Sequence, residues 1–139
     1  YAAFGLSYSG AVNISLHSTV LVVDDQDAAV RFYCDVMGWQ VVVDNQMGPH
    51  HRLLVVTPPG QGTGFALGQP HIHGKAAATT DSPQDAGIYL VSDNLLADCA
   101  TLRERGVVFH MEPEPMPWGG HGAVFADPFG NKFFITDAS

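Results

Sequence analysis

STVLVVD, at residues 18–24, returns in altered form as GIYLVSD at residues 87–93, 69 positions further along the chain. A turn that ends in Pro-Pro-Gly60 has a counterpart that ends in Pro-Phe-Gly130, 70 positions later. This period exceeds the roughly 20 to 50 residues of a solenoid repeat and is too short for an independent domain. The sequence therefore predicts two half-domains that share one core in a chain of 139 residues.

Each half contains one predicted helix. The first spans about residues 27–37 and ends at Gly38, and the second spans about residues 94–105 and ends at Gly106. Apolar residues recur at helical spacing in both, and aspartate or asparagine side chains precede each helix, where they can cap its free N–H groups. A glycine after the last turn is a typical helix stop.

The strands complete the predicted pattern of strand, helix, strand, strand, strand in each half. Strands are expected at residues 14–23, 39–44, 51–57, 64–69, 87–92, 107–111, 122–126 and 132–136. The predicted organisation is a single domain at residues 14–139, with a first module at 14–69, a surface linker at 70–85, a second module at 86–137 and an N-terminal extension at 1–13.

The composition of the chain argues against nucleic acid and membranes as partners. Six basic and fourteen acidic residues give a net charge of −8, which repels a phosphate backbone, so no nucleic acid is expected as a partner. No apolar run approaches the roughly 20 residues that span a bilayer, so we expect no membrane association and a cytoplasmic location. Cys34 and Cys99 fall within apolar helical patterns and are expected to be reduced core thiols.

Four short stretches, in this order and spacing, resemble the signature of a known family. They are DDQDAAVRFY at residues 24–33, MGW at 37–39, LRERG at 102–106 and ADPFGNK at 126–132. The chain is similar to the glyoxalase/bleomycin-resistance/dioxygenase superfamily, also called vicinal oxygen chelate. The resemblance implies an α+β fold in which two tandem βαβββ modules form a cup-shaped mixed β-sheet, with a ligand inside the cup and, in many relatives, a homodimer.

The resemblance also implies where metal ligands would lie. In metal-dependent relatives one ligand comes from the first and one from the last strand of each module. The matching positions here are Ser18, Ala66, Gly87 and Phe134. None is a good ligand for a transition metal, which favours imidazole, carboxylate or thiolate donors. We therefore expect no metal and no cofactor, and favour the metal-free, drug-binding branch of the family.

Aromatic side chains are the leading candidates for ligand contacts. Tyr89 shares its strand face with Gly87, Phe134 occupies a former ligand position, and Trp118 follows the sixth predicted strand. Stacking rings beside the small or missing side chains at Ser18, Ala66 and Gly87 would make a pocket for an aromatic or cationic, antibiotic-like molecule. The alternative for Phe134 is that its ring simply fills the cup as core.

The histidines define a second hypothesis. His51 and His121 are equivalent in the repeat and could flank a ligand, or lie at the rim. His17 adjoins a ligand position, and a shift of strand register by one residue would turn it into the cup. Paired histidines, His50 with His51 and His71 with His73, could hold a metal or lie solvated in loops. On this hypothesis the protein is an enzyme, a lyase, isomerase or dioxygenase with a non-standard site.

Overall fold

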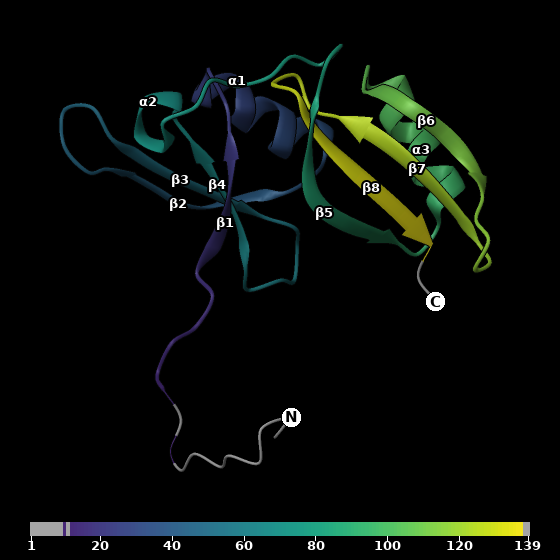
Figure 1. Ribbon diagram of the computed structural model, residues 1–139, viewed down its shortest axis with the longest axis horizontal. Helices are drawn as coiled ribbons and strands as arrows, with labels where there is room; N and C mark the ends of the chain where they lie inside the picture. Colours follow the sequence, from purple (N-terminus) through teal and green to yellow (C-terminus); the bar gives the residue numbers. More distant parts are fainter. Residues whose placement is uncertain (1–9, 11, 138–139) are drawn as a thin grey trace.

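The computed structural model describes residue 10 and residues 12–137 (Figure 1). The first module consists of β1 (Ser18–Val22), α1 (Gln26–Val30), η1 (Arg31–Val36), β2 (Gln40–Gln46), β3 (Arg52–Thr57) and β4 (Gly64–Gly68). After the short α2 (Pro70–His73), the second consists of β5 (Gln84–Ser92), α3 (Leu95–Glu104), β6 (Val108–Pro115), β7 (His121–Ala126) and β8 (Asn131–Asp137). The predicted tandem βαβββ pattern is confirmed.

The eight strands form two four-stranded mixed sheets. Their strand orders are β1-β4-β3-β2 and β5-β8-β7-β6, so the second module repeats the topology of the first. In each sheet the first strand pairs in parallel with the last, and the remaining pairs are antiparallel. β1 and β5 are each an edge strand, and within the described residues each pairs with one strand only, β4 and β8 respectively.

One face of each sheet contributes to a common core. Leu21, Leu54 and Leu67 of the first sheet cluster with Phe125 and Phe133 of the second, and all are buried. The ring of Phe65 meets that of Phe133 edge-on at a centroid distance of 6.4 Å, which joins the modules. Because side chains alternate along a strand, the residues between these point to the opposite face, which we call the outer face of each sheet.

The first helix differs from the ordinary α-helix that the periodicity predicts. Only its first turn is α-helical, and residues 31–36 form a π-helix in which the N–H of Met37 donates to the carbonyl of Phe32, five residues earlier, at 3.1 Å. Asp25 caps its start by accepting from the N–H of Ala28. Gly38, with a φ of +76°, then turns the chain toward β2.

A buried hydrogen bond fastens this helix to the second module. The hydroxyl of Tyr33 donates to Oδ2 of Asp127 at 2.6 Å, and neither residue is exposed. Oδ1 of Asp127 accepts from the N–H groups of Phe129 and Asn131, so the carboxylate also shapes the turn between β7 and β8. Burial raises the pKa of Asp127, and the bonds it accepts counter that rise.

Several predicted boundaries were wrong, and β6 continues to Pro115 where the prediction ends the strand at residue 111. The first strand begins at Ser18 and not at residue 14, because its partner β4 begins at Gly64 and offers nothing to pair with earlier residues. Residues 12–17 instead run away from the body of the molecule (Figure 1). The expected linker is also partly structured, since it contains α2 and the start of β5. Most of the expected N-terminal extension lies outside the described residues.

Two further observations bear on the expectations from composition. Over the described part of the chain, no helix has both the length and the apolar character needed to cross a bilayer. Cys34 and Cys99 are both free, and Cys99 is fully buried against the core. Burial raises the pKa of both thiols.

Candidate aromatic binding face

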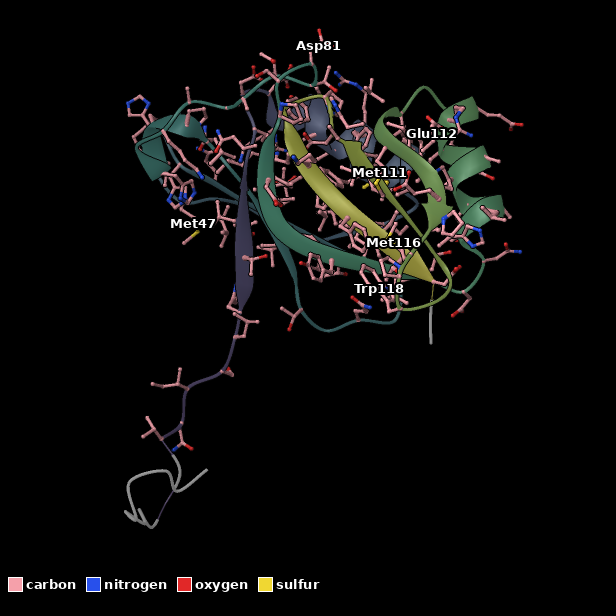
Figure 2. All side chains as sticks on the ribbon, turned by 45° about the vertical axis from the view of Figure 1, so that its right-hand side comes forward. Met47, Asp81, Met111, Glu112, Met116 and Trp118 are labelled. Atoms are coloured by element: carbon pink, nitrogen blue, oxygen red, sulfur yellow. The ribbon has the colours of Figure 1, made fainter. Side chains whose placement is uncertain are left out.

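Three aromatic side chains gather on the outer face of the second sheet. The ring of Phe134 on β8 lies 5.5 Å from that of Tyr89 on β5 and 6.3 Å from that of Trp118, which follows β6. Both pairs are edge-to-face, at interplanar angles of 65° and 64°. Tyr89 is 79% and Trp118 68% exposed. We call these three residues the aromatic face; Figure 2 shows Trp118 at the lower end of the sheet, near Met116.

Strand register explains why Tyr89 and Phe134 meet. Tyr89 is directly opposite Phe134 in the β5–β8 pair, and Phe134 is opposite Val124 in the β7–β8 pair. Residues directly opposite on neighbouring strands share a face. The other neighbour of the Phe134 ring is Gly122, where an added Cβ would lie 2.8 Å from Cζ of Phe134. Gly122 therefore leaves the space that the ring occupies.

The aromatic face borders a cavity of about 480 Å³. Its lining residues are Asp85, Tyr89, Trp118, Val124, Lys132, Phe133, Phe134 and Thr136. Asp85 and Lys132 are opposite one another in the β5–β8 register and supply one carboxylate and one ammonium group. Aromatic walls with a few charged groups at one end can stack a planar molecule and orient its polar substituents.

Ser18 and Ala66 belong to the outer face of the first sheet. Ala66 is opposite Val20 on β1 and Val55 on β3, which is the same position that Phe134 has between Tyr89 and Val124. The repeat thus places a methyl group in one sheet where the other has a phenyl ring. The cavity at the aromatic face is lined by the second module, and Ser18 and Ala66 do not border it.

The four positions that would hold a metal in relatives do not suit one here. Among Ser18, Ala66, Gly87 and Phe134 the only side-chain donor is the Ser18 hydroxyl, which lies 3.0 Å from Nδ1 of His17. Gly87 has a φ of +68° at a break in the β5–β8 register, a backbone conformation that disfavours any side chain. Nor do the described residues contain a cluster of three His, Cys, Asp or Glu side chains placed to hold an ion.

None of the remaining predicted histidines lines the cavity at the aromatic face. His121 begins β7; its N–H donates to Oδ2 of Asp137 at 2.7 Å, and its Nδ1 lies 3.7 Å from the same oxygen. His51 immediately precedes β3 and is half-buried. Nε2 of His71 is 2.7 Å from the carbonyl oxygen of His50. His73 packs on Gly68, where an added Cβ would lie 2.3 Å from its Nε2.

The sequence did not indicate five of the residues that line the cavity, which are Asp85, Val124, Lys132, Phe133 and Thr136. Asp85 lies in the predicted linker and has the same strand parity as Tyr89, so an earlier start of the fifth strand would have indicated it. Lys132 has the same parity as Phe134 within the predicted eighth strand, and Gly122, which packs against the ring of Phe134, lies in the predicted seventh. No sequence signal pointed to the space at Gly122, because that space depends on the rotamer of Phe134.

Comparisons with known proteins agree with this architecture. The family model described as Glyoxalase/Bleomycin resistance protein/Dioxygenase superfamily matches residues 15–135. A crystal structure of a member of that superfamily from Sphaerobacter thermophilus is similar at 38% identity and a TM-score of 0.81, covering 90% of this chain and 98% of that one. TnmS3, an antibiotic binding protein from Streptomyces sp. CB03234, is similar at 33% identity and a TM-score of 0.75, covering 93% of this chain and 100% of its own.

A curated relative is similar over most of its length as well. The Bacillus subtilis protein YetH, itself uncharacterized, is 28% identical over 120 residues, which are 86% of this chain and 95% of the relative. The predicted family resemblance is therefore confirmed at the level of both sequence and fold.

Proposed function

This chain belongs to the Glyoxalase/Bleomycin resistance protein/Dioxygenase superfamily, and from that premise we propose that it binds a planar aromatic, antibiotic-like molecule without changing it chemically. The observation that carries the proposal is the aromatic face. Tyr89 and Trp118 are more than two-thirds exposed although both are large and amphipathic. Clustered exposed aromatic side chains are a typical feature of binding sites.

The charge of the whole molecule supports a cationic ligand, whereas the cavity itself holds one carboxylate, of Asp85, and one ammonium group, of Lys132. Asp85 borders the cavity, and the net charge of −8 gives the whole molecule a field that attracts cations. Oδ1 of Asp85 accepts from the N–H of Gly87, which orients the carboxylate and leaves its second oxygen for a ligand. The similarity to TnmS3 supports the antibiotic class, because that protein is described as antibiotic binding.

Homodimerisation in the cytoplasm is part of the proposal. The free edges of β1 and β5 have no strand partner among the described residues, and Val20, Tyr89 and Val91 on these strands are exposed. A second copy that set its β1 beside β5 would turn two four-stranded sheets into one eight-stranded cup. The outer face with Ser18 and Ala66 would then lie opposite the aromatic face of the partner and enclose the ligand.

The test is a titration with doxorubicin, a planar aromatic cation that carries its own fluorescence. We expect saturable binding by the wild-type protein and a dissociation constant about tenfold higher for Trp118→Ala, since one lost stacking contact is worth roughly 1 to 1.5 kcal/mol. Leu96→Ala removes an apolar side chain of α3 that is also exposed, at 54%, and serves as the matched control, with unchanged affinity.

Three results would count against drug binding at the aromatic face. If neither doxorubicin nor bleomycin raised the melting temperature at saturating concentration, the drug-binding function would be rejected, because tight binding to the folded state alone must stabilise it. Equal binding by wild type and Trp118→Ala would reject the aromatic face as the site. Conversion of the drug to a new product, followed by mass spectrometry, would favour an enzyme.

A further inference from the structure

A second cavity lies on the helix side of the molecule, where the two modules meet. It has a volume of about 500 Å³ and lies between the first helix, the residues after α3, and the turn between β7 and β8. Phe32 and Val36 form its wall on the first module, and Val107, Val108 and Pro128 form its wall on the second. We call it the seam cavity. It shares no lining residue with the cavity at the aromatic face.

The charge of the seam cavity is opposite to that of the molecule. Arg31 and Arg105 line it with a single acidic residue, Asp35, in a chain that has six basic and fourteen acidic residues. The other two arginines are both paired with carboxylates, Arg52 with Asp27 and Asp44, and Arg103 with Glu112. Neither Arg31 nor Arg105 forms an ion pair within the part of the chain that the structure describes.

The local backbone holds this arrangement in place. Arg31, Phe32 and Val36 all belong to the π-helix η1, a rare conformation that recurs at functional sites. Its last carbonyl, that of Val36, accepts from Nη1 of Arg105 at 2.7 Å. This bond holds the guanidinium of Arg105, in the second module, against the first helix. The other N–H groups of that guanidinium can donate to an anion.

We propose that the seam cavity binds a small amphipathic monocarboxylate. The carboxylate would accept from the guanidinium groups of Arg31 and Arg105, and the apolar part would pack against Phe32 and Val108. A cavity of this size falls in the range of small-molecule sites, roughly 300 to 1,000 Å³, and its walls are apolar except at the two arginines, Asp35 and Thr80. The site is independent of the proposed antibiotic binding, because the two cavities have different residues and opposite charge preference.

Octanoate is the probe for the test, and 1-octanol is its uncharged match. We expect calorimetry to show saturable binding of octanoate that weakens with added salt, and at least about tenfold weaker binding of octanol. Arg31→Gln should weaken octanoate binding about fivefold or more, whereas Arg103→Gln, on a cation already paired with Glu112, should leave it unchanged. Because Arg31 is exposed and forms no ion pair within the described residues, Arg31→Gln should not alter the melting temperature appreciably.

A second variant tests the apolar wall of the seam cavity. Val108→Asp places a carboxylate on an exposed wall residue and should abolish octanoate binding. Trp118→Ala should bind octanoate as the wild type does. The proposal is overturned if octanoate shows no saturable binding at millimolar concentration, if Arg31→Gln and Val108→Asp bind it normally, or if Trp118→Ala loses it. Loss of doxorubicin binding alone would bear only on the antibiotic function.

Discussion

Tyr33 and Asp127 form the one buried polar contact that joins the first helix to the second module, as far as the described residues show. Tyr33→Phe removes the hydroxyl at 2.6 Å from Oδ2 and leaves the carboxylate with its bonds from Asn131 and Phe129. A hydrogen bond to a charged group is worth roughly 1.5 to 3 kcal/mol, so we expect the free energy of unfolding at pH 7 to fall by about 2 kcal/mol. Tyr89→Phe, on an exposed ring, is the control and should change it by less than about 0.5 kcal/mol.

The pH dependence of this loss has a definite sign. Burial raises the pKa of Asp127 above its ordinary value of 3.8, so the stability linked to this group is fully present below that value and is lost as the pH rises through the folded-state pKa. The Tyr33 hydroxyl lowers that pKa, and its removal raises it further. The difference between wild type and Tyr33→Phe should therefore grow from pH 4 to pH 7. Urea unfolding at both pH values measures it, and a constant difference would contradict the assignment.

At the scale of elements, the repeat provides a matched pair of glycines. Gly60 and Gly130 end equivalent turns with φ values of +78° and +80°, so alanine meets the same backbone strain at both, roughly 1 to 2 kcal/mol. Their surroundings differ. A Cβ on Gly60 would meet nothing within 4 Å, whereas one on Gly130 would lie 2.5 Å from backbone atoms of Ala78 and Thr79.

Gly130→Ala should accordingly destabilise the protein more than Gly60→Ala. We expect the free energy of unfolding to fall by about 1 to 2 kcal/mol in Gly60→Ala and by at least about 3 kcal/mol in Gly130→Ala. In the second variant the added methyl group would push the linker away from the turn and strain the hydrogen bond from the N–H of Gln84 to the carbonyl of Gly130. Thermal and urea unfolding of both variants measure the difference. Equal losses would mean that the linker does not pack on this turn in solution.

The same elements show what the sequence could and could not predict. The strands and the second helix were predictable because alternation, capping and glycine stops act locally, and Asn94 does cap α3 as expected. The π-helix was not, since RFYCDV has the spacing of an ordinary helix. Tyr89 and Phe134 were predictable from strand parity, whereas the seam cavity depends on how the modules pack and left no pattern in the sequence.

For the whole molecule, the most informative feature is how much apolar surface a single copy leaves exposed. The structure has two four-stranded mixed sheets, as the tandem βαβββ fold implies, and the outer faces of both carry exposed apolar side chains. Val20, Tyr89, Val91 and Trp118 are all exposed on or near these faces. Contiguous exposed apolar side chains are typical of interfaces. The proposed homodimer accounts for it.

The residues that precede β1 allow the homodimer to be tested without touching the aromatic face. Ile14 and Leu16 are 83% and 67% exposed and alternate with the polar Asn13 and Ser15, which is the pattern of a strand with one face for burial. If a second copy covers that face, the double variant Ile14→Asp, Leu16→Asp should raise the dimer dissociation constant at least about a hundredfold, since each buried aliphatic side chain contributes roughly 1.5 to 3 kcal/mol. The double variant Asn13→Asp, Ser15→Asp adds the same charge to the other face and should dissociate far less.

Sedimentation equilibrium measures both dissociation constants, and circular dichroism checks that each monomer stays folded. The homodimer would be contradicted if the wild-type protein sedimented as a monomer, or if the two double variants dissociated equally. Residues 14 and 16 would then contact no second copy, and only the ligand would cover the outer faces of the sheets.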